Sequence, residues 1–127
     1  DPVDQATDRQ AAAKRIIAAC AAHPLMLSGS ASFNSTVLAE TAERALLKGG
    51  AEGVYTAAVP GLGLGICVKA DDGASRAASV ALGAILCHLG VLDEAAQARL
   101  QTHLKPEISN WAGSHIGVIQ ASENLSF

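Results

Sequence analysis

A lysine followed by two glycines lies inside a segment, residues 46–59, that otherwise predicts a buried β-strand. Glycine inside a strand lowers its stability and usually marks a bulge or a close approach to the backbone. On such a strand Lys48 can reach a site, and the missing Cβ atoms of Gly49 and Gly50 let a substrate lie against the backbone. We therefore take Lys48 as a candidate catalytic residue and the two glycines as candidate substrate-binding residues. The alternative is a surface lysine next to a glycine bulge.

Serine acyl-transfer enzymes of the β-lactamase type use the lysine of a K-[ST]-G strand in this manner. Its positive charge lies near the nucleophilic serine and a substrate carboxylate. The sequence lacks a partner motif, since it contains no G-x-S-x-G, S-x-x-K, H-E-x-x-H or P-loop. The G-L-G-L-G run at 61–65 joins two predicted strands rather than a strand and a helix, so it does not fit a dinucleotide-binding turn. The sequence thus offers a lysine without an evident nucleophile.

Three cysteines and four histidines are the remaining residues with metal or redox chemistry. Cys20, Cys67 and Cys87 are widely separated, no C-x-x-C is present and the histidines share no common spacing. This pattern predicts free thiols in a reducing compartment, and we expect a cytoplasmic protein. We expect no metal site and no cofactor in this chain.

Charge and hydropathy argue against two classes of partner. The net charge is −3 and the basic residues form no stripe, which argues against nucleic-acid binding. No apolar run approaches the roughly 20 residues that span a bilayer, which argues against a membrane protein. Half of the residues are hydrophobic, but alanine makes up much of that half. The core must therefore be built from small side chains at close spacing.

Hydrophobic periodicity and capping signals predict the elements that position the lysine. The order is α-α-β-β-α-α-β, and the two central strands form an antiparallel hairpin through the turn at 60–63. The predicted helices cover residues 4–22, 32–44, 71–90 and 94–104, with caps at Ser32 or Asn34, at Asp72 and at Asp93. The predicted strands cover residues 46–59, 64–70 and 114–122.

This order predicts an α+β fold with one antiparallel sheet, made of the hairpin plus a C-terminal strand, and helices packed on it. Three strands leave two open edges, which isolated soluble domains usually cover or pair. We therefore expect more polypeptide to lie beside this chain.

Three stretches, in this order and spacing, resemble the C-terminal part of the L-asparaginase II family, the Rhizobium-type asparaginases. They are HPLMLSGSASFNSTVL, KGGAEGVYTAAVPGLGLGICVKADDGASRA and PEISNWAGSHIGVI, within residues 14–122. The resemblance implies a fold akin to serine β-lactamases and glutaminases. It also implies hydrolysis of L-asparagine to L-aspartate and ammonia through serine–lysine pairs. By this resemblance Lys48 matches the lysine that pairs with a catalytic serine, and the protein is a homodimer.

The chain lacks several residues that the resemblance would lead us to expect. The catalytic serines, the S-x-x-K lysine, and the cysteines and lysine that bind zinc in the family have no counterpart here. Ser28, Ser30 and Ser32 lie in a predicted loop that does not align with the nucleophile. The resemblance therefore implies that residues 1–127 are a single domain or the C-terminal segment of a larger asparaginase domain. The chain alone is expected to be inactive, with the missing N-terminal segment as its partner.

Two other interpretations remain open at the level of sequence. The chain can be a non-catalytic α+β binding or interaction module in which K-G-G-A-E-G is a bulged strand. It can also be a segment of a glutaminase-like amidohydrolase with another amide substrate. The sequence does not separate asparagine from glutamine, and it does not show whether residue 1 is a natural terminus.

Overall fold

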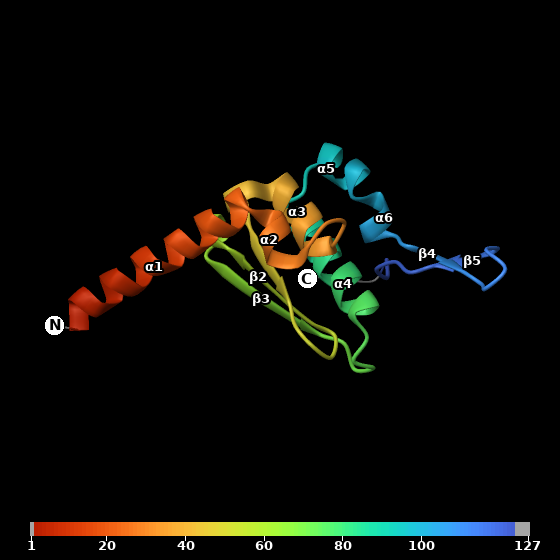
Figure 1. Ribbon diagram of the computed structural model, residues 1–127, viewed down its shortest axis with the longest axis horizontal. Coiled ribbons are helices and arrows are strands. Elements are labelled where there is room, and N and C mark those ends of the chain that lie inside the picture. The colour runs from red at the N-terminus through yellow and green to blue at the C-terminus, as the bar shows by residue number, and fades with distance from the viewer. Residues whose placement is uncertain (1, 124–127) are drawn as a thin grey trace.

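The structure of the chain, a computed structural model, describes residues 2–123 and has the α+β architecture that the sequence predicts (Figure 1). The helices are α1 (Pro2–Ala22), α2 (Pro24–Ser28), α3 (Phe33–Thr41), α4 (Ser75–His88), α5 (Glu94–Arg99) and α6 (Gln101–Leu104). The strands are β1 (Leu46–Gly49), β2 (Val54–Val59), β3 (Leu64–Lys69), β4 (Glu107–Ser109) and β5 (His115–Val118). Two short 3₁₀ turns, Ala42–Arg44 and Pro60–Leu62, complete the described secondary structure.

The segment 46–59 is a hairpin and not a single strand with a bulge, so that prediction was wrong. β1 and β2 pair antiparallel, with Lys48 opposite Thr56. Between them the chain reverses at Glu52 and Gly53, whose φ angles of 57° and 66° lie in the left-handed region. A turn needs this conformation and glycine adopts it readily, so the glycine-rich sequence marks the reversal. The predicted antiparallel pairing of the next two strands, β2 and β3, is confirmed.

The C-terminal strand does not join this sheet, which corrects the predicted hairpin plus C-terminal strand. The structure has a three-stranded sheet in the order β1-β2-β3 and a separate two-stranded sheet of β4 and β5. Residues expected to form only a connector supply β4, so the last strand pairs with its immediate neighbour in sequence. A short loop closes at a smaller entropic cost than a long one, which favours this local pairing.

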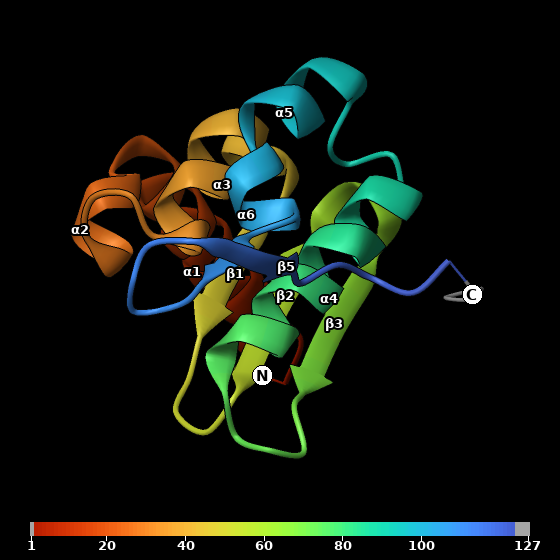
Figure 2. The same ribbon diagram turned by 90° about the vertical axis from the view of Figure 1, so that its right-hand side faces the viewer.

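One face of the three-stranded sheet is covered by helices and the other is open among the described residues. Leu47, Ala57 and Val59 alternate with exposed or half-buried residues and face the core. α3 packs on β1 and α4 packs on β2 and β3, and Figure 2 shows these helices in front of the sheet. The largest fully buried side chains are Leu38, Leu47, Leu82, Leu86, Leu92 and Leu100.

Helix boundaries follow the predicted caps in two cases out of three. The Ser32 side chain accepts a hydrogen bond from the Ser35 N–H at 3.2 Å, and Asp93 accepts one from Ala96 N–H at 2.8 Å. The prediction that Asp72 caps α4 was wrong. The Asp72 side chain accepts a hydrogen bond from the Ala74 N–H at 2.9 Å within the turn before the helix, and α4 begins after Ala74. The predicted loop after Pro24 contains α2, and the predicted helix 94–104 is divided into α5 and α6 at Leu100.

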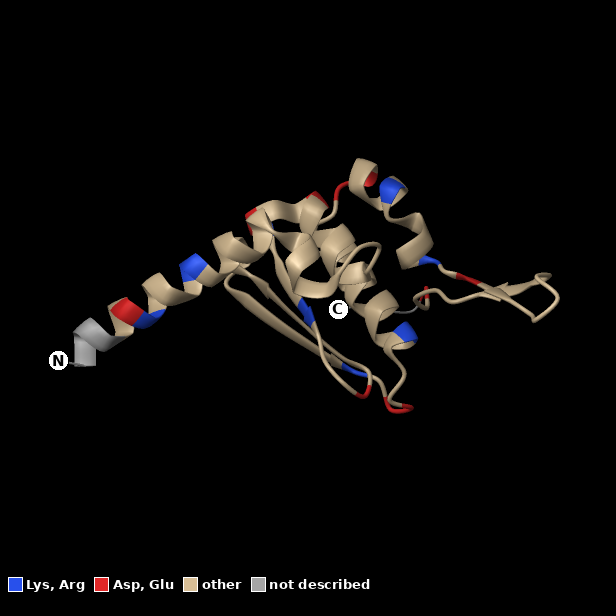
Figure 3. Ribbon diagram, viewed as in Figure 1, with Lys and Arg blue, Asp and Glu red and all other residues tan. Residues whose placement is uncertain are grey.

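Among the described residues, the Lys and Arg positions are scattered along the ribbon and are interspersed with Asp and Glu positions (Figure 3). Across the residues the structure describes, no helix is both long and apolar enough to cross a membrane.

Candidate functional site

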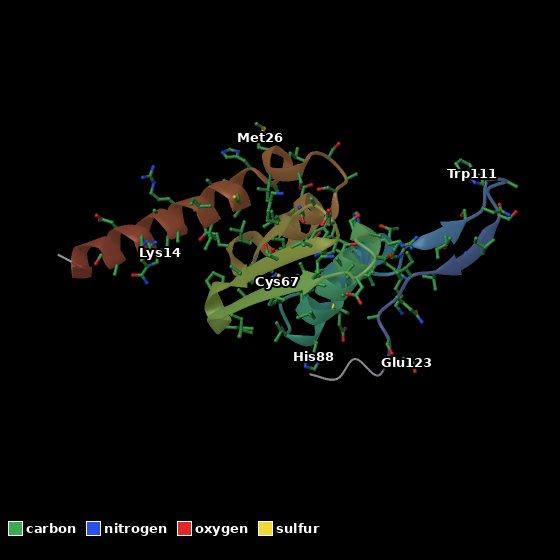
Figure 4. The ribbon with its side chains drawn as sticks, turned by 90° about the horizontal axis from the view of Figure 1, so that it is seen from below. Lys14, Met26, Cys67, His88, Trp111 and Glu123 are labelled. Atoms are coloured by element: carbon green, nitrogen blue, oxygen red, sulfur yellow. The ribbon has the colours of Figure 1, made fainter. Side chains whose placement is uncertain are left out.

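Lys48 lies on β1, at an edge of the sheet, and its side chain is exposed on the open face. The strand register places Thr56 beside Lys48 and Cys67 beside Thr56 in one row across the three strands. Cys67 is labelled on the sheet in Figure 4. A shallow depression of about 380 Å³ follows this row. Its lining consists of Leu46, Lys48, Thr56, Ala57, Ala58, Gly65, Ile66 and Cys67.

One local hydrogen bond involves the ammonium group of Lys48, and a second involves its backbone. Its Nζ donates to the main-chain oxygen of Gly49, and the Thr56 hydroxyl donates to the main-chain oxygen of Lys48 at 3.2 Å. No serine lines the depression. The described chain therefore presents a cationic group in a shallow hollow without the serine that such a lysine would serve.

Gly49 presents backbone hydrogen-bonding groups at the same edge. In an antiparallel pair, residues alternate between those that bond the partner strand and those whose N–H and C=O point away. Gly50 donates to the Val54 oxygen at 2.8 Å, which places Gly50 and Lys48 in the bonded set and Gly49 in the outward set. Within residues 2–123 no strand pairs with the outer edge of β1. The Gly49 N–H and C=O thus lie beside the Lys48 ammonium.

The glycine at position 49 is also required by packing on the covered face. A Cβ atom there would lie 3.1 Å from Cζ of Tyr55, its partner across β2. The Tyr55 ring packs edge-on against Phe33, with ring centroids 5.5 Å apart. Burial raises the pKa of the Tyr55 hydroxyl. A side chain at 49 would displace this ring, whereas at Gly50 a Cβ would make ordinary contacts with Val54. Gly49 therefore leaves room for the Tyr55 ring, which packs against Phe33 on the covered face.

The glycine turns at the ends of the two segments K-G-G-A-E-G, residues 48–53, and K-A-D-D-G, residues 69–73, pack against each other. A Cβ atom on Gly53 would lie 2.9 Å from both the Cβ of Ala70 and the carbonyl carbon of Gly73. The Ala70 N–H donates to the Gly53 oxygen at 2.9 Å. This contact ties the end of the β1–β2 hairpin to the end of β3. The motif spacing is thus explained by a turn-on-turn contact that sets where the Lys48 strand lies.

The serines predicted to lie in a loop instead form a hydrogen-bonded cluster at the start of α3. Ser32 Oγ lies 2.7 Å from Ser28 Oγ and 2.5 Å from Ser35 Oγ, and the Ser35 hydroxyl donates to the Gly29 oxygen at 2.5 Å. Ser30 is exposed and lies outside this cluster. None of these serines lines the depression beside Lys48. The cluster therefore caps and fastens the helix start.

The sequence did not lead us to select Thr56, Cys67 or Ser35 as candidate site residues. Thr56 and Cys67 become neighbours of Lys48 only through the strand register, which could not be derived once 46–59 was interpreted as one strand. Ser35 could have been found, because 28, 32 and 35 follow helical spacing.

The described residues do not fit a metal site. No group of three or more His, Cys, Asp or Glu side chains within the described chain could hold an ion. Cys20, Cys67 and Cys87 are free and lie on α1, β3 and α4. Burial raises the pKa of the Cys87 thiol, which disfavours the thiolate that binds zinc. The described residues therefore offer no ligand set for the zinc that the family resemblance implies.

Comparison with known proteins shows the family of the chain. A family model described as L-asparaginase II matches residues 2–121, from α1 through β5. The matched range includes Lys48, both glycine turns and the β4–β5 hairpin. No curated protein matches the chain.

Proposed function

Because the chain belongs to the L-asparaginase II family, we propose that it forms part of an amidohydrolase site that converts L-asparagine to L-aspartate and ammonia. In this proposal residues 1–127 are the C-terminal segment of a larger asparaginase domain with a β-lactamase-like fold. Lys48 is the catalytic lysine, and a neighbouring N-terminal segment supplies the serine. The observation that carries the proposal is the position of Lys48. Lys48 lies on β1, whose outer edge pairs with no strand within residues 2–123. It lines a shallow hollow, and its ammonium lies beside the outward-facing backbone of Gly49.

The chemistry requires two acyl-transfer steps. The serine oxygen attacks the side-chain carbonyl carbon of asparagine, the carbon–nitrogen bond breaks, and ammonia leaves with the proton that the serine loses. Water then attacks the resulting ester, so that aspartate is released and the serine regains its proton. Lys48 contributes in one of two ways: in its neutral form it relays the serine proton, and in its charged form it stabilises the developing oxyanion.

In this proposal Gly49 binds substrate through its outward backbone groups. Gly50, whose N–H donates to the Val54 oxygen, contributes to substrate binding only through its missing Cβ atom. The outward N–H of Gly49 is a donor for a negatively charged oxygen, either the oxyanion or the α-carboxylate of asparagine. Its missing Cβ keeps Tyr55 in place and leaves the strand edge unobstructed. Gly50 begins the turn that ends β1 at this point.

The test replaces Lys48 in the complete enzyme. Lys48→Ala should lower asparagine turnover by about a hundredfold or more, the scale of a lost acid–base group. Lys69→Ala is the matched control, because Lys69 is exposed on the same sheet face and also donates to the main-chain oxygen of the next residue. Ammonia release from L-asparagine is the measurement. Equal kinetics for Lys48→Ala and Lys69→Ala would remove Lys48 from the mechanism.

A second candidate is a non-catalytic interaction module. It is favoured by the exposure of Lys48 and by the absence of a serine in the hollow that it lines. If it is correct, Lys48→Ala leaves every activity of the complete protein unchanged. A glutaminase-like segment is distinguished by comparing turnover of glutamine and asparagine in the same assay. We further propose a cytoplasmic location, because all three cysteines are free.

A further inference from the structure

The β4–β5 hairpin projects from the body of the protein (Figure 1), and a cavity of about 290 Å³ lies at its base. The walls of the cavity come from α4, α5, the end of α6 and the segment that follows β5. The Ile119 N–H donates to the Pro106 oxygen at 3.0 Å, which joins the chain entering β4 to the chain leaving β5. The cavity shares no lining residue with the depression beside Lys48. It is therefore a separate candidate site.

The floor of the cavity is apolar. Ala84 and Cys87 of α4 and Leu104 at the end of α6 line it, and all three are half-buried. Pockets for drug-sized ligands have volumes of about 300–1,000 Å³, an apolar lining and a few placed polar groups. This cavity lies at the lower end of that range, so it suits a ligand no larger than a small metabolite.

A side-chain amide on the cavity wall is held in a fixed orientation. Gln97 lines the cavity, and its Nε2 donates a hydrogen bond to the main-chain oxygen of Leu92 at 2.8 Å. This bond orients the amide group and leaves the side-chain oxygen of Gln97 as an acceptor. The wall therefore offers a positioned acceptor for a donor group of a ligand.

Two opposite charges line the same cavity. Lys105 follows α6 and Glu123 follows β5, and both side chains are exposed at the cavity. Within the described residues, neither side chain takes part in an ion pair. A ligand with a single charge would meet one like charge here, which is unfavourable. A small ligand that carries one negative and one positive group can pair with both residues.

We propose that this cavity binds a free α-amino acid with a small uncharged side chain. Lys105 binds its carboxylate, whereas Glu123 and the side-chain oxygen of Gln97 accept hydrogen bonds from its ammonium group. The side chain of the ligand packs on the apolar floor, where a further charge would be buried without a partner. The site is a binding site, and it is independent of the chemistry assigned to Lys48.

The first test uses L-alanine and the two cysteines that line different hollows. In the complete protein, alkylation by N-ethylmaleimide is followed at each cysteine by peptide mass spectrometry over a concentration series of L-alanine. Alkylation of Cys87 should slow to a saturating limit, because Cys87 lines the cavity. Alkylation of Cys67, which lines the depression beside Lys48, should not change. Equal slowing at both cysteines would overturn the proposal.

Hydrogen exchange makes the result independent of the reactivity of one thiol. Backbone amides of residues 97–105 and 119–121 should exchange more slowly over the same L-alanine concentrations, since bound ligand links these segments. If neither amide exchange nor Cys87 alkylation responds to L-alanine, the cavity does not bind amino acids and the proposal is wrong.

Two analogues of nearly the same size test each charge of the ligand. L-Lactate has a hydroxyl in place of the ammonium group, and L-alaninamide has a neutral amide in place of the carboxylate. Each should need a concentration about tenfold higher than L-alanine for the same protection, the scale of a lost hydrogen bond to a charged group. Equal protection by all three compounds would show that charge pairing does not define the site.

Variants then assign each charge to its residue. Lys105→Gln and Glu123→Gln should each raise the L-alanine concentration needed for protection by about tenfold. Lys14→Gln is the control and should bind like the parent, because Lys14 is an exposed lysine on α1, away from the cavity (Figure 4). Circular dichroism checks that each variant keeps the parent fold. Equal binding by the control and both cavity variants would overturn the proposal.

Combining variants with analogues identifies which end of the ligand meets which residue. L-Alaninamide should bind Lys105→Gln no more weakly than L-alanine does, since the contact that it lacks is already lost. L-Lactate should behave in the same way with Glu123→Gln. If each analogue instead loses a further tenfold in its matched variant, these residues do not bind the charges of the ligand and the assignment is wrong.

Discussion

The β1–β2 hairpin and the β4–β5 hairpin, residues 107–118 and called the arm, have similar turns but differ in how much of the protein packs on them. Both are antiparallel, and both turn through a glycine with a positive φ angle, 66° at Gly53 and 80° at Gly113. In the first hairpin Leu47 is fully buried, and the turn packs against the neighbouring turn at Gly73. In the arm the turn glycine has no neighbouring atoms within 4 Å of an added Cβ. Tertiary packing therefore stabilises the first hairpin, whereas the arm depends on its own hydrogen bonds.

The β1–β2 hairpin is therefore part of the packed body, whereas the β4–β5 hairpin is not. The β1–β2 hairpin holds Lys48 on an edge that cannot shift without disturbing the core beneath it. The β4–β5 hairpin has few contacts with the body, because no other described element packs substantially on it.

The largest effect is expected where the two turns meet. Gly53→Ala forces a side chain into a left-handed conformation and against backbone atoms 2.9 Å away, so it should destabilise the fold by about 2–4 kcal/mol. Urea denaturation followed by circular dichroism gives the free energy of unfolding.

Gly63→Ala is the matched control for this prediction. Gly63 also has a positive φ, 64°, but an added Cβ would have no atom within 4 Å. It should cost only the conformational part, about 1 kcal/mol. If both variants lose the same stability, packing between the turns does not stabilise the β1–β2 hairpin, and the contrast with the arm fails.

A smaller and local effect is expected in the arm. Asn110→Ala removes the acceptor for two turn N–H groups, so the arm should lose amide hydrogen-exchange protection over residues 107–118. The free energy of unfolding of the body should change by less than about 0.5 kcal/mol, as for surface substitutions. A cooperative loss of body stability would show that arm and body form one folding unit.

The smallest effect concerns an ion pair of the body. Arg99 forms two hydrogen bonds to the Glu40 carboxylate and links α5 to α3. Arg99 Nε lies 2.9 Å from Glu40 Oε1, and Arg99 Nη2 lies 2.6 Å from Glu40 Oε2. The Arg99 hydrogen bonds lower the pKa of Glu40 below its ordinary value of 4.5. A carboxylate with a lowered pKa stabilises the folded state above its unfolded pKa, and this contribution is lost as pH falls through the folded pKa.

The stability difference between the parent and Arg99→Gln should therefore be full at neutral pH and shrink as pH falls below 4.5. Denaturant titrations at several pH values measure it. Amide hydrogen-exchange protection of residues 107–118 should not differ between the parent and Arg99→Gln, because the ion pair lies in the body. A difference that grows in acid would contradict the assignment.

Local sequence signals predicted most of the helical boundaries. Ser32 and Asp93 cap α3 and α5 as expected, because an N-cap acts on N–H groups two or three residues away. The length of α1 and the start of α3 follow from the same kind of local rule. α2 was missed because a five-residue helix after His23-Pro24 leaves too short a pattern to recognise.

Sheet pairing could be predicted only where a short turn joined the strands. The β2–β3 hairpin was correct, but the glycines of β1 and its turn were compatible with either a bulge or a reversal, and only the packing of Gly53 on Gly73 decides between them. The site has the same limit. Lys48 could be chosen from its motif, whereas its neighbours Thr56 and Cys67 depend on register across three strands.

The sequence by itself determined the α+β class, the family and the identity of the lysine, because composition, periodicity and motif spacing are carried by residues close together in the chain. The tertiary structure decided which strand edge carries Lys48, what lies beneath Gly49, and that the last strand leaves the sheet to form the arm. Those outcomes depend on contacts between residues distant in sequence, where close packing of a few side chains selects one arrangement from several that the local signals allow.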